Sequence, residues 1–165
     1  MVIIKTSAGD IELELFEKEA PITVKNFLDY VDAGHYDNTI FHRVIDNFMI
    51  QGGGFDAEFE EKPTGKPIKN EASNKISNKL GTVAMARTNQ VHSATAQFFI
   101  NVKDNNFLDF QSETPQGFGY CVFGKVTKGM DVIEKIKSVE THSVGYYDDV
   151  PVETVTINEI RRKNA

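Results

Sequence analysis

Hydrophobic and polar residues alternate along much of the chain, in short stretches bounded by glycine, asparagine, aspartate or serine. The first such stretch is residues 11–15, where Ile11, Leu13 and Leu15 alternate with two glutamates. This stretch and residues 2–6 flank the turn sequence SAGD, a pattern that predicts an antiparallel hairpin with one buried face. We therefore expect the chain to open with two paired strands.

Two segments instead carry apolar residues at helical spacing. A proline and a glycine bound the first of them, and proline suits the first turn of a helix while glycine suits its end. The sequence therefore predicts one helix from Pro21 to about Gly34 and a second over residues 130–137. The inward-facing residues are expected to be Val24, Phe27, Leu28 and Val31 in the first, and Val132, Ile133 and Ile136 in the second.

Most of the remaining apolar stretches predict strands, because they are short and rich in β-branched or aromatic residues. They are TIFHRVI, FMIQ, GTVAMAR, AQFFINV, GYCVFGKV and, near the end of the chain, VETVTINEI. Many short strands with two helices predict a mainly β fold, a closed antiparallel barrel with helices over its ends. Residues 53–78 and 103–118 show neither pattern, and loops of that length are often functional.

The composition fits one folded domain over residues 1–165 with an acidic surface. Hydrophobic residues make up 40% of the chain, charged residues 25%, and the formal net charge is −6. Binding to a nucleic-acid backbone needs a basic face, so nucleic acid is not expected as a partner. The one dense basic run, residues 161–163, is interpreted as a solvated tail.

The sequence predicts a cytoplasmic protein without a membrane partner. Its N-terminus lacks the basic and apolar regions of a signal peptide, and no segment approaches the roughly 18–20 apolar residues of a membrane span. The single cysteine, Cys121, leaves no intrachain disulfide to form. Its apolar neighbours indicate a small core residue rather than a nucleophile.

The residues that usually carry metal, cofactor or hydrolytic chemistry are not arranged for it. The histidines show no metal-ligand spacing, and one cysteine does not support a zinc site. QGGGF lacks the strand-to-helix setting of a dinucleotide site, and no P-loop is present. His92 and Ser93 are neighbours, but no G-x-S-x-G turn accompanies them. The sequence therefore predicts no metal and no cofactor. The four histidines of the chain are His35, His42, His92 and His142.

What remains is one cation, Arg43, within the apolar stretch FHRVIDNFMIQGGG at residues 41–54. Strand alternation sends Arg43 to the same side as Phe41 and Ile45, and His42 to the opposite side as a structural residue. The pattern alone leaves two readings open. Arg43 is either a surface residue whose stem lies on apolar neighbours or a functional cation in an apolar site.

The stretch NFLDYVDAGHYDNTIFHRVIDNFMIQGG resembles the core signature of the cyclophilins, the cyclosporin-type peptidyl-prolyl isomerases. The resemblance continues through GTVAMART, SATAQFFINV and GYCVFGKVTKGMDVIEKI, in the same order, and covers nearly the whole chain. The pattern F-H-R-x-I-x-x-F-M-x-Q-G-G is highly specific. The chain is especially similar to compact cytoplasmic bacterial members. The resemblance implies a closed eight-stranded antiparallel barrel with a helix at each end and an active-site groove on its outer face.

The resemblance also implies a role for each residue of that groove. Arg43 would be the catalytic residue, and Phe107 would add an aromatic wall beside Leu108. The backbone of Ala86 and Arg87 would run along the substrate. The proline pocket would consist of Phe48, Met49, Phe99 and Leu108, with Tyr120 at its edge, while Gln51 and Gln97 would position polar groups.

Three positions depart from the best-known cyclophilins. Phe107 stands where many members carry tryptophan, Tyr120 where many carry histidine, and Arg87 where asparagine is common. In related cyclophilins the indole N–H at the first position donates a hydrogen bond to cyclosporin. Because phenylalanine has no such donor, weak cyclosporin binding is expected.

The sequence therefore predicts a monomeric isomerase that acts on proline-containing peptides and on unfolded or partly folded proteins. One alternative is a cyclophilin-like module that holds proline-containing segments with little turnover. The presence of Arg43 together with the pocket residues favours the enzyme. Another alternative, a hollow barrel for a small molecule, is disfavoured because the many Phe and Ile residues suit a filled interior.

Overall fold

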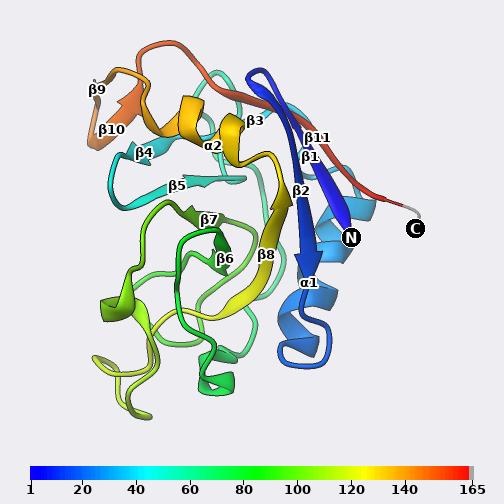
Figure 1. The fold of residues 1–165 in the computed structure, drawn as a ribbon, viewed down its shortest axis with the longest axis vertical. Coiled ribbons are helices and arrows are strands. Elements are labelled where there is room, and N and C mark those ends of the chain that lie inside the picture. Colours follow the sequence, from blue (N-terminus) through cyan, green and yellow to red (C-terminus); the bar gives the residue numbers. More distant parts are fainter. Residues whose placement is uncertain (164–165) are drawn as a thin grey trace.

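The computed structural model describes residues 1–163 as a strongly curled antiparallel sheet on which two helices pack (Figure 1). The strand order of the main sheet is β3-β11-β1-β2-β8-β6-β7-β5-β4. Its strands are β1 (Val2–Thr6), β2 (Gly9–Leu15), β3 (Thr39–Ile40), β4 (Arg43–Ile45), β5 (Met49–Gly52), β6 (Thr82–Met85), β7 (Phe98–Asn101), β8 (Val122–Lys128) and β11 (Thr156–Arg162). A mainly β fold with antiparallel strands and two helices is thus confirmed.

The barrel is open, and in this respect the prediction of a closed, eight-stranded barrel is wrong. The sheet has nine strands, and its two end strands are β3 and β4, between which no ladder forms within residues 1–163. Both end strands come from the segment that was expected to be one strand, TIFHRVI. Phe41 lies between them with a fully buried side chain, and its N–H still donates to the carbonyl of Val155, in register with the pairing of Ile40 and Thr156. At the seam, β3 instead meets the chain that follows β5. The N–H of Ile40 donates to the carbonyl of Phe55 at 2.9 Å, the N–H of Gly53 donates to the carbonyl of Ile40 at 3.4 Å, and an isolated bridge pairs Thr39 with Asp56.

This break also corrects the expected direction of Arg43. Arg43 is exposed, whereas Phe41 lies in the main core, so the two side chains do not share a face. Ile45, two residues further along β4, does face the same side as Arg43, where it packs against a second apolar cluster. Alternation therefore holds within β4 and fails across the seam.

Two helices cover the curled sheet, and both follow the predicted pattern. Helix α1 (Pro21–Asp32) buries Val24, Phe27 and Val31, with Leu28 partly buried, and α2 (Met130–Lys137) buries Val132, Ile133 and Ile136. Phe27 anchors α1, because its ring lies 5.8 Å from that of Phe98 and 5.1 Å from that of Phe123. Between residues 1 and 163 no helix is long and apolar enough to cross a membrane.

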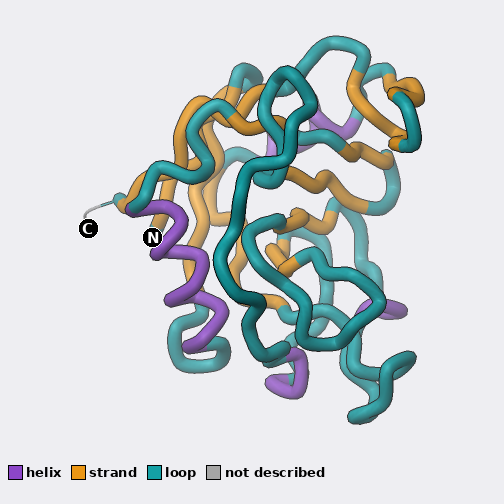
Figure 2. The backbone as a smooth tube through the Cα atoms, turned by 180° about the vertical axis from the view of Figure 1, so that it is seen from behind, coloured by secondary structure: helices purple, strands orange, loops and turns teal. Residues whose placement is uncertain are grey.

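The remaining chain is mostly loop, which the teal tube in Figure 2 shows from behind. The segments between β5 and β6 and between β7 and β8 each contain one short 3-10 turn, at Ala72–Asn74 and Asn106–Leu108. A separate two-stranded sheet, β9 (Thr141–Val144) and β10 (Tyr147–Pro151), was not predicted. Cys121 is buried, as expected, and burial raises the pKa of its thiol to about 11, so the thiol is unreactive at neutral pH.

The contacts of Phe27 predict that it contributes much of the stability of α1. We expect Phe27→Ala to lower the free energy of unfolding by about 3–5 kcal/mol, because a large buried ring is removed. Ile22→Ala, on the exposed side of the same helix, should cost about 1 kcal/mol or less. Urea unfolding followed by circular dichroism measures both. Equal losses in the two variants would show that α1 is not anchored through Phe27.

Candidate active site

Strands β5, β6 and β7 send alternate side chains to opposite faces of the sheet, and the site forms on the outer face. Ile50, Val83 and Ile100 point into the main core. Their neighbours in the chain form a separate apolar cluster on the other face, which includes Met49, Ala84 and Phe99. Because successive residues of a strand alternate, each of these strands contributes both to the core and to the outer cluster.

The register of the ladders brings Arg43 beside this outer cluster. Arg43 pairs with Gln51 on β5, Gln51 pairs with Phe99 on β7, and Phe99 pairs with Ala84 on β6. Directly paired residues in a sheet have neighbouring side chains. Four residues that are far apart in the sequence therefore lie in one row across four strands.

A cavity of about 130 Å³ opens over this row. It contains no carboxylate, imidazole or thiol, and its charged groups are two guanidinium groups. Nine of the residues implied by the sequence resemblance line it together: Arg43, Phe48, Met49, Gln51, Ala86, Arg87, Phe99, Leu108 and Tyr120. A site of this composition binds an apolar group and donates hydrogen bonds, but has no general acid or base of the usual kind.

The two other expected residues, Gln97 and Phe107, lie just outside this cavity. Gln97 accepts a hydrogen bond of 2.9 Å from Gln51, whose own Oε1 lies 3.5 Å from Nη1 of Arg43. Gln97 is therefore the far end of a polar chain that leads to Arg43. Phe107 stacks on Phe48 with 5.6 Å between the ring centroids and stays 68% exposed, so it extends the aromatic wall at the rim.

The glycines after Gln51 allow the backbone to pass close to the hydrogen-bonded side chains of Gln97 and Gln51. A Cβ atom on Gly54 would lie 2.4 Å from Nε2 of Gln97 and 2.5 Å from two of its carbon atoms. No side chain fits there without displacing Gln97. The glycine run therefore keeps the loop backbone against the amide group that positions Gln51.

Behind the cavity lies a buried network of three asparagines that sequence reasoning missed: Asn78, Asn101 and Asn105. Asn105 donates through Nδ2 to Asn101 and to the carbonyl of Phe48, both at 2.8 Å. Asn101 donates to Asn78 at 3.1 Å. Asn78 and Asn105 lie in irregular segments, where asparagine is a common turn residue, and Asn101 ends β7, so nothing in the sequence pattern distinguished them.

The network ends on two more walls of the cavity. Nδ2 of Asn78 lies 3.3 Å from the carbonyl oxygens of both Leu108 and Tyr120. Together with the contact to Phe48, the asparagines therefore hold the backbone of three cavity walls, one from the turn between β4 and β5 and two from the segment between β7 and β8. A buried and satisfied polar network of this kind makes the surrounding structure rigid.

His42 neighbours Arg43 in the chain but does not line the cavity. It is buried between the rings of Phe55 and Phe59, with centroid distances of 4.6 and 6.3 Å. Burial, and to a lesser degree the charge of Arg43, lower the pKa of His42 from 6.5 to about 4. The imidazole is therefore neutral at pH 7 and lies away from the cavity.

No grouping of residues in the part of the chain that the structure describes resembles a metal site. Among residues 1–163 no three or more His, Cys, Asp or Glu side chains come together in a way that would hold an ion. The geometry thus consists of a cavity with apolar walls, two arginines in its lining and a rigid support behind it.

Comparisons with known proteins agree with this geometry. The family described as cyclophilin type peptidyl-prolyl cis-trans isomerase matches residues 1–162. Peptidyl-prolyl cis-trans isomerase B of Escherichia coli is 58% identical over 97% of this chain and 98% of its own length, and cyp18 of Streptomyces antibioticus is 60% identical over 97% and 96%. A crystal structure of a cyclophilin type isomerase from Cryptosporidium parvum, determined in the presence of the dipeptide Ala-Pro, is similar with a TM-score of 0.79 and 26% identity over 99% of both chains.

The match spans nearly the whole sequence and extends to the curled sheet with its two helices. On the sequence and on the fold alike, the chain belongs to the cyclophilin-type peptidyl-prolyl cis-trans isomerases.

Proposed function

We propose that this isomerase turns X-Pro peptide bonds in the cavity beside Arg43 and that Arg43 is the catalytic residue. The observation that carries the proposal is the row Arg43–Gln51–Phe99, which holds a permanent cation against an apolar cavity that lacks carboxylate, imidazole and thiol groups. The isomerisation makes and breaks no covalent bond and needs none of these groups.

The chemistry depends on the amide resonance of the X-Pro bond. Rotation has a barrier of about 18–20 kcal/mol in ordinary peptide bonds, because the C–N partial double bond must be lost. At the twisted transition state the proline nitrogen regains a lone pair, which the planar amide lacks. Arg43 donates a hydrogen bond to that nitrogen, so the interaction is strong only in the transition state, where it lowers the barrier.

An arginine suits this task better than a lysine would. Its guanidinium remains charged at all relevant pH values and presents its donors in a fixed plane. Gln51 and Gln97 support that orientation from one side. Apolar walls reduce the access of water, which strengthens the hydrogen bond.

The other residues of the site would bind the substrate peptide. Phe48, Met49, Phe99 and Leu108 would hold the proline ring, with Phe107 and Tyr120 at the rim. The peptide backbone would run beside Ala86 and Arg87, where the chain leaves β6. This arrangement is supported by the shared cavity and by the position of these residues just after the end of β6 at Met85.

Cyclophilins act on proline-containing peptides and proteins, and this chain does so as a member of the family. We infer further that residues 1–165 work as one monomeric domain on unfolded or partly folded chains and assist slow folding steps. A cytoplasmic location remains a prediction from the sequence. A size-exclusion experiment with light scattering tests the monomer.

The proposed role of Arg43 predicts a large loss on substitution. We expect Arg43→Ala to lower kcat/KM by about 100-fold or more, the scale for removal of one preorganised donor. The thermal unfolding midpoint should hardly change, because Arg43 is exposed. A protease-coupled assay on a short X-Pro peptide measures the rate. Arg161→Ala, which removes an exposed arginine from β11, serves as the control. Near-normal activity in folded Arg43→Ala would refute the mechanism.

The absence of a general acid or base in the mechanism predicts a flat pH profile. Activity should stay constant between about pH 6.5 and 9 and should survive EDTA, since His42 is already neutral there. A bell-shaped profile would indicate a proton-transfer group. Loss of activity on chelation that metal restores would contradict the metal-free mechanism.

The lowered pKa of His42 has a separate consequence for stability. The unfolded chain binds a proton at this residue near pH 6.5 and the folded chain only near pH 4. The stabilisation from neutral His42 is therefore complete above pH 6.5 and is lost as the pH falls towards 4. Urea unfolding between pH 4 and 7 should show that the free energy of unfolding falls as the pH falls. The fall should be smaller in His42→Phe. Equal slopes in both proteins would contradict the assignment.

Phe107 predicts weak inhibition by cyclosporin. It provides an apolar rim but no N–H donor, and one missing hydrogen bond costs on the order of 1 kcal/mol. We expect Phe107→Trp to be inhibited more tightly, with peptide turnover little changed, because Phe107 is largely exposed and outside the cavity. Phe107→Leu, which also lacks a donor, is the control. If wild type and Phe107→Trp have equal inhibition constants, the missing donor does not set the affinity.

A further inference from the structure

We propose that the side chain of Arg87 is a positioning residue, which fixes the ring of Tyr120 at the edge of the proline pocket and so sets the affinity for the peptide. The inference rests on the proposed function of the cavity and assigns Arg87 a task beyond its backbone position beside the substrate. It concerns the side chain that stands where asparagine is common in the family.

The first observation is that the Arg87 side chain is held in place at both ends of its guanidinium group. Nε and Nη2 donate to the carbonyl oxygen of Gly119 at 3.1 and 3.0 Å. Nη1 donates to the carbonyl oxygen of Thr88 at 2.9 Å. Three donors on two backbone carbonyls leave the group with little freedom, since the planar fork fits such paired contacts.

The second observation is that the same group covers the ring of Tyr120. Cζ of Arg87 lies 4.5 Å from the ring centroid, which is the geometry of a cation–π interaction. Gly119 directly precedes Tyr120 in the chain. Arg87 therefore makes two kinds of contact that fix Tyr120. It is hydrogen-bonded to the preceding backbone carbonyl, and it covers the face of the Tyr120 ring.

The third observation is what lies on the other sides of Tyr120. Its ring meets that of Phe99 edge to face, with 5.8 Å between centroids and 77° between planes. Its N–H donates to the carbonyl of Leu108 at 2.9 Å. Phe99 and Leu108 are both cavity residues, so Arg87 covers a ring that packs against one wall of the pocket and whose backbone is hydrogen-bonded to another.

The turn at Gly119 is the point at which Arg87 holds the backbone that leads into Tyr120. Gly119 has a φ of +76°, and a Cβ atom there would lie 2.6 Å from the carbonyl oxygen of Leu108. Gly119 therefore lies close to Leu108 and has no side chain of its own. The preceding residue, Phe118, is buried against the rings of Phe110 and His92. Besides Arg87, one buried side chain, Asn70, donates to the Gly119 carbonyl, at 3.1 Å.

These contacts predict a role in binding and not in the chemical step. An ordered Tyr120 provides its wall before the peptide arrives, so less freedom is lost on binding. Loss of a cation–π contact at a partly exposed site corresponds to a change of about 2- to 10-fold in an equilibrium constant. We therefore expect Arg87→Met, which keeps an unbranched apolar stem, to weaken peptide binding and lower kcat/KM by that factor with kcat little changed.

A double-mutant cycle tests whether Arg87 acts through Tyr120. The proteins are wild type, Arg87→Met, Tyr120→Leu and the double variant, each assayed for kcat/KM and for the Kd of a proline peptide by NMR titration. Tyr120→Leu should itself lower kcat/KM. In that background Arg87→Met should change kcat/KM by less than about 2-fold, because the ring it positions is gone.

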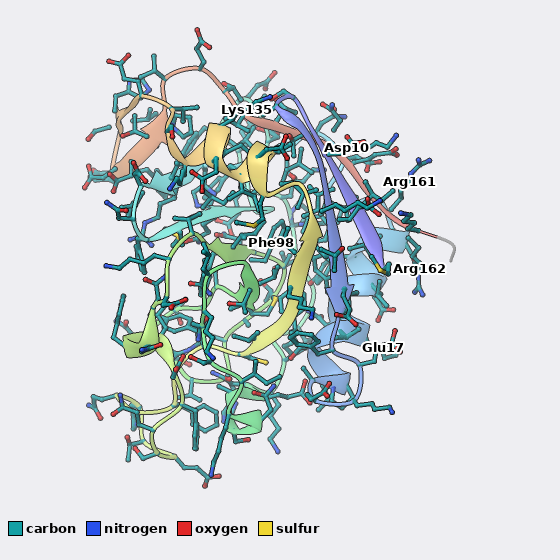
Figure 3. All side chains as sticks on the ribbon, in the orientation of Figure 1. Asp10, Glu17, Phe98, Lys135, Arg161 and Arg162 are labelled. Atoms are coloured by element: carbon teal, nitrogen blue, oxygen red, sulfur yellow. The ribbon has the colours of Figure 1, made fainter. Side chains whose placement is uncertain are left out.

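Two further variants separate positioning from general effects of charge. Arg87→Lys keeps a cation over the ring but loses the fork, so its Kd should lie between those of wild type and Arg87→Met. Arg161→Met removes the same charge from β11, whose Arg161 is labelled in Figure 3, and should leave the Kd unchanged. A similar loss in Arg161→Met would show that net charge is responsible and would overturn the proposal.

The remaining outcomes also decide the question. Equal effects of Arg87→Met with and without the Tyr120 ring would overturn the proposal, since Arg87 would then act directly on the peptide or on the fold. Full activity in Tyr120→Leu would overturn it too, because Tyr120 would have no part in binding. Neither result touches the catalytic role of Arg43, which the loss of activity in Arg43→Ala tests separately.

Discussion

The alternation of side chains along β5, β6 and β7 is the constraint on which the rest of this structure depends. In β7, Phe98 and Ile100 fill the core while Phe99 faces the cavity. A shift of one residue in the pairing of β7 would exchange these faces, because the side-chain period of a strand is two. The same hydrogen bonds that fix the core therefore place Arg43, Gln51 and Phe99 in one row.

The sheet supplies only one side of the site, and loops supply the other. Phe48, Leu108 and Tyr120 come from turns and long connections, which are usually the mobile parts of a protein. Here the buried asparagine network holds their carbonyls from behind, and Arg87 holds Tyr120 from outside. The mechanism proposed for Arg43 depends on one well-placed hydrogen bond and would benefit from such rigidity, since no reorganisation is needed when the peptide bond twists.

Local patterns predicted the parts of this fold that depend on local sequence. Helix α2 follows from the spacing of Val132, Ile133 and Ile136, and the resemblance to cyclophilins named residues that the structure brings together. The break at Phe41 was missed because TIFHRVI satisfies strand propensity throughout, and long-range pairing with β11 and β5 decides where it divides. The asparagine network and the stacking of Arg87 on Tyr120 were missed for a related reason. Both join residues that are distant in the sequence, and their partners are known only once the chain has folded.

The seam between β3 and β4 has a consequence for association with other chains. An open sheet has two edges, and a long exposed edge recruits other strands and promotes aggregation. A cyclophilin acts on proline-containing peptides and proteins, so its sheet edges meet other chains. In this sheet the edge strands have only two and three residues, and the chain between them bends Phe41 into the core. The backbone of Ile40 is also already hydrogen-bonded to Phe55 and Gly53, so the sheet offers almost no template on which another chain could add itself as a strand.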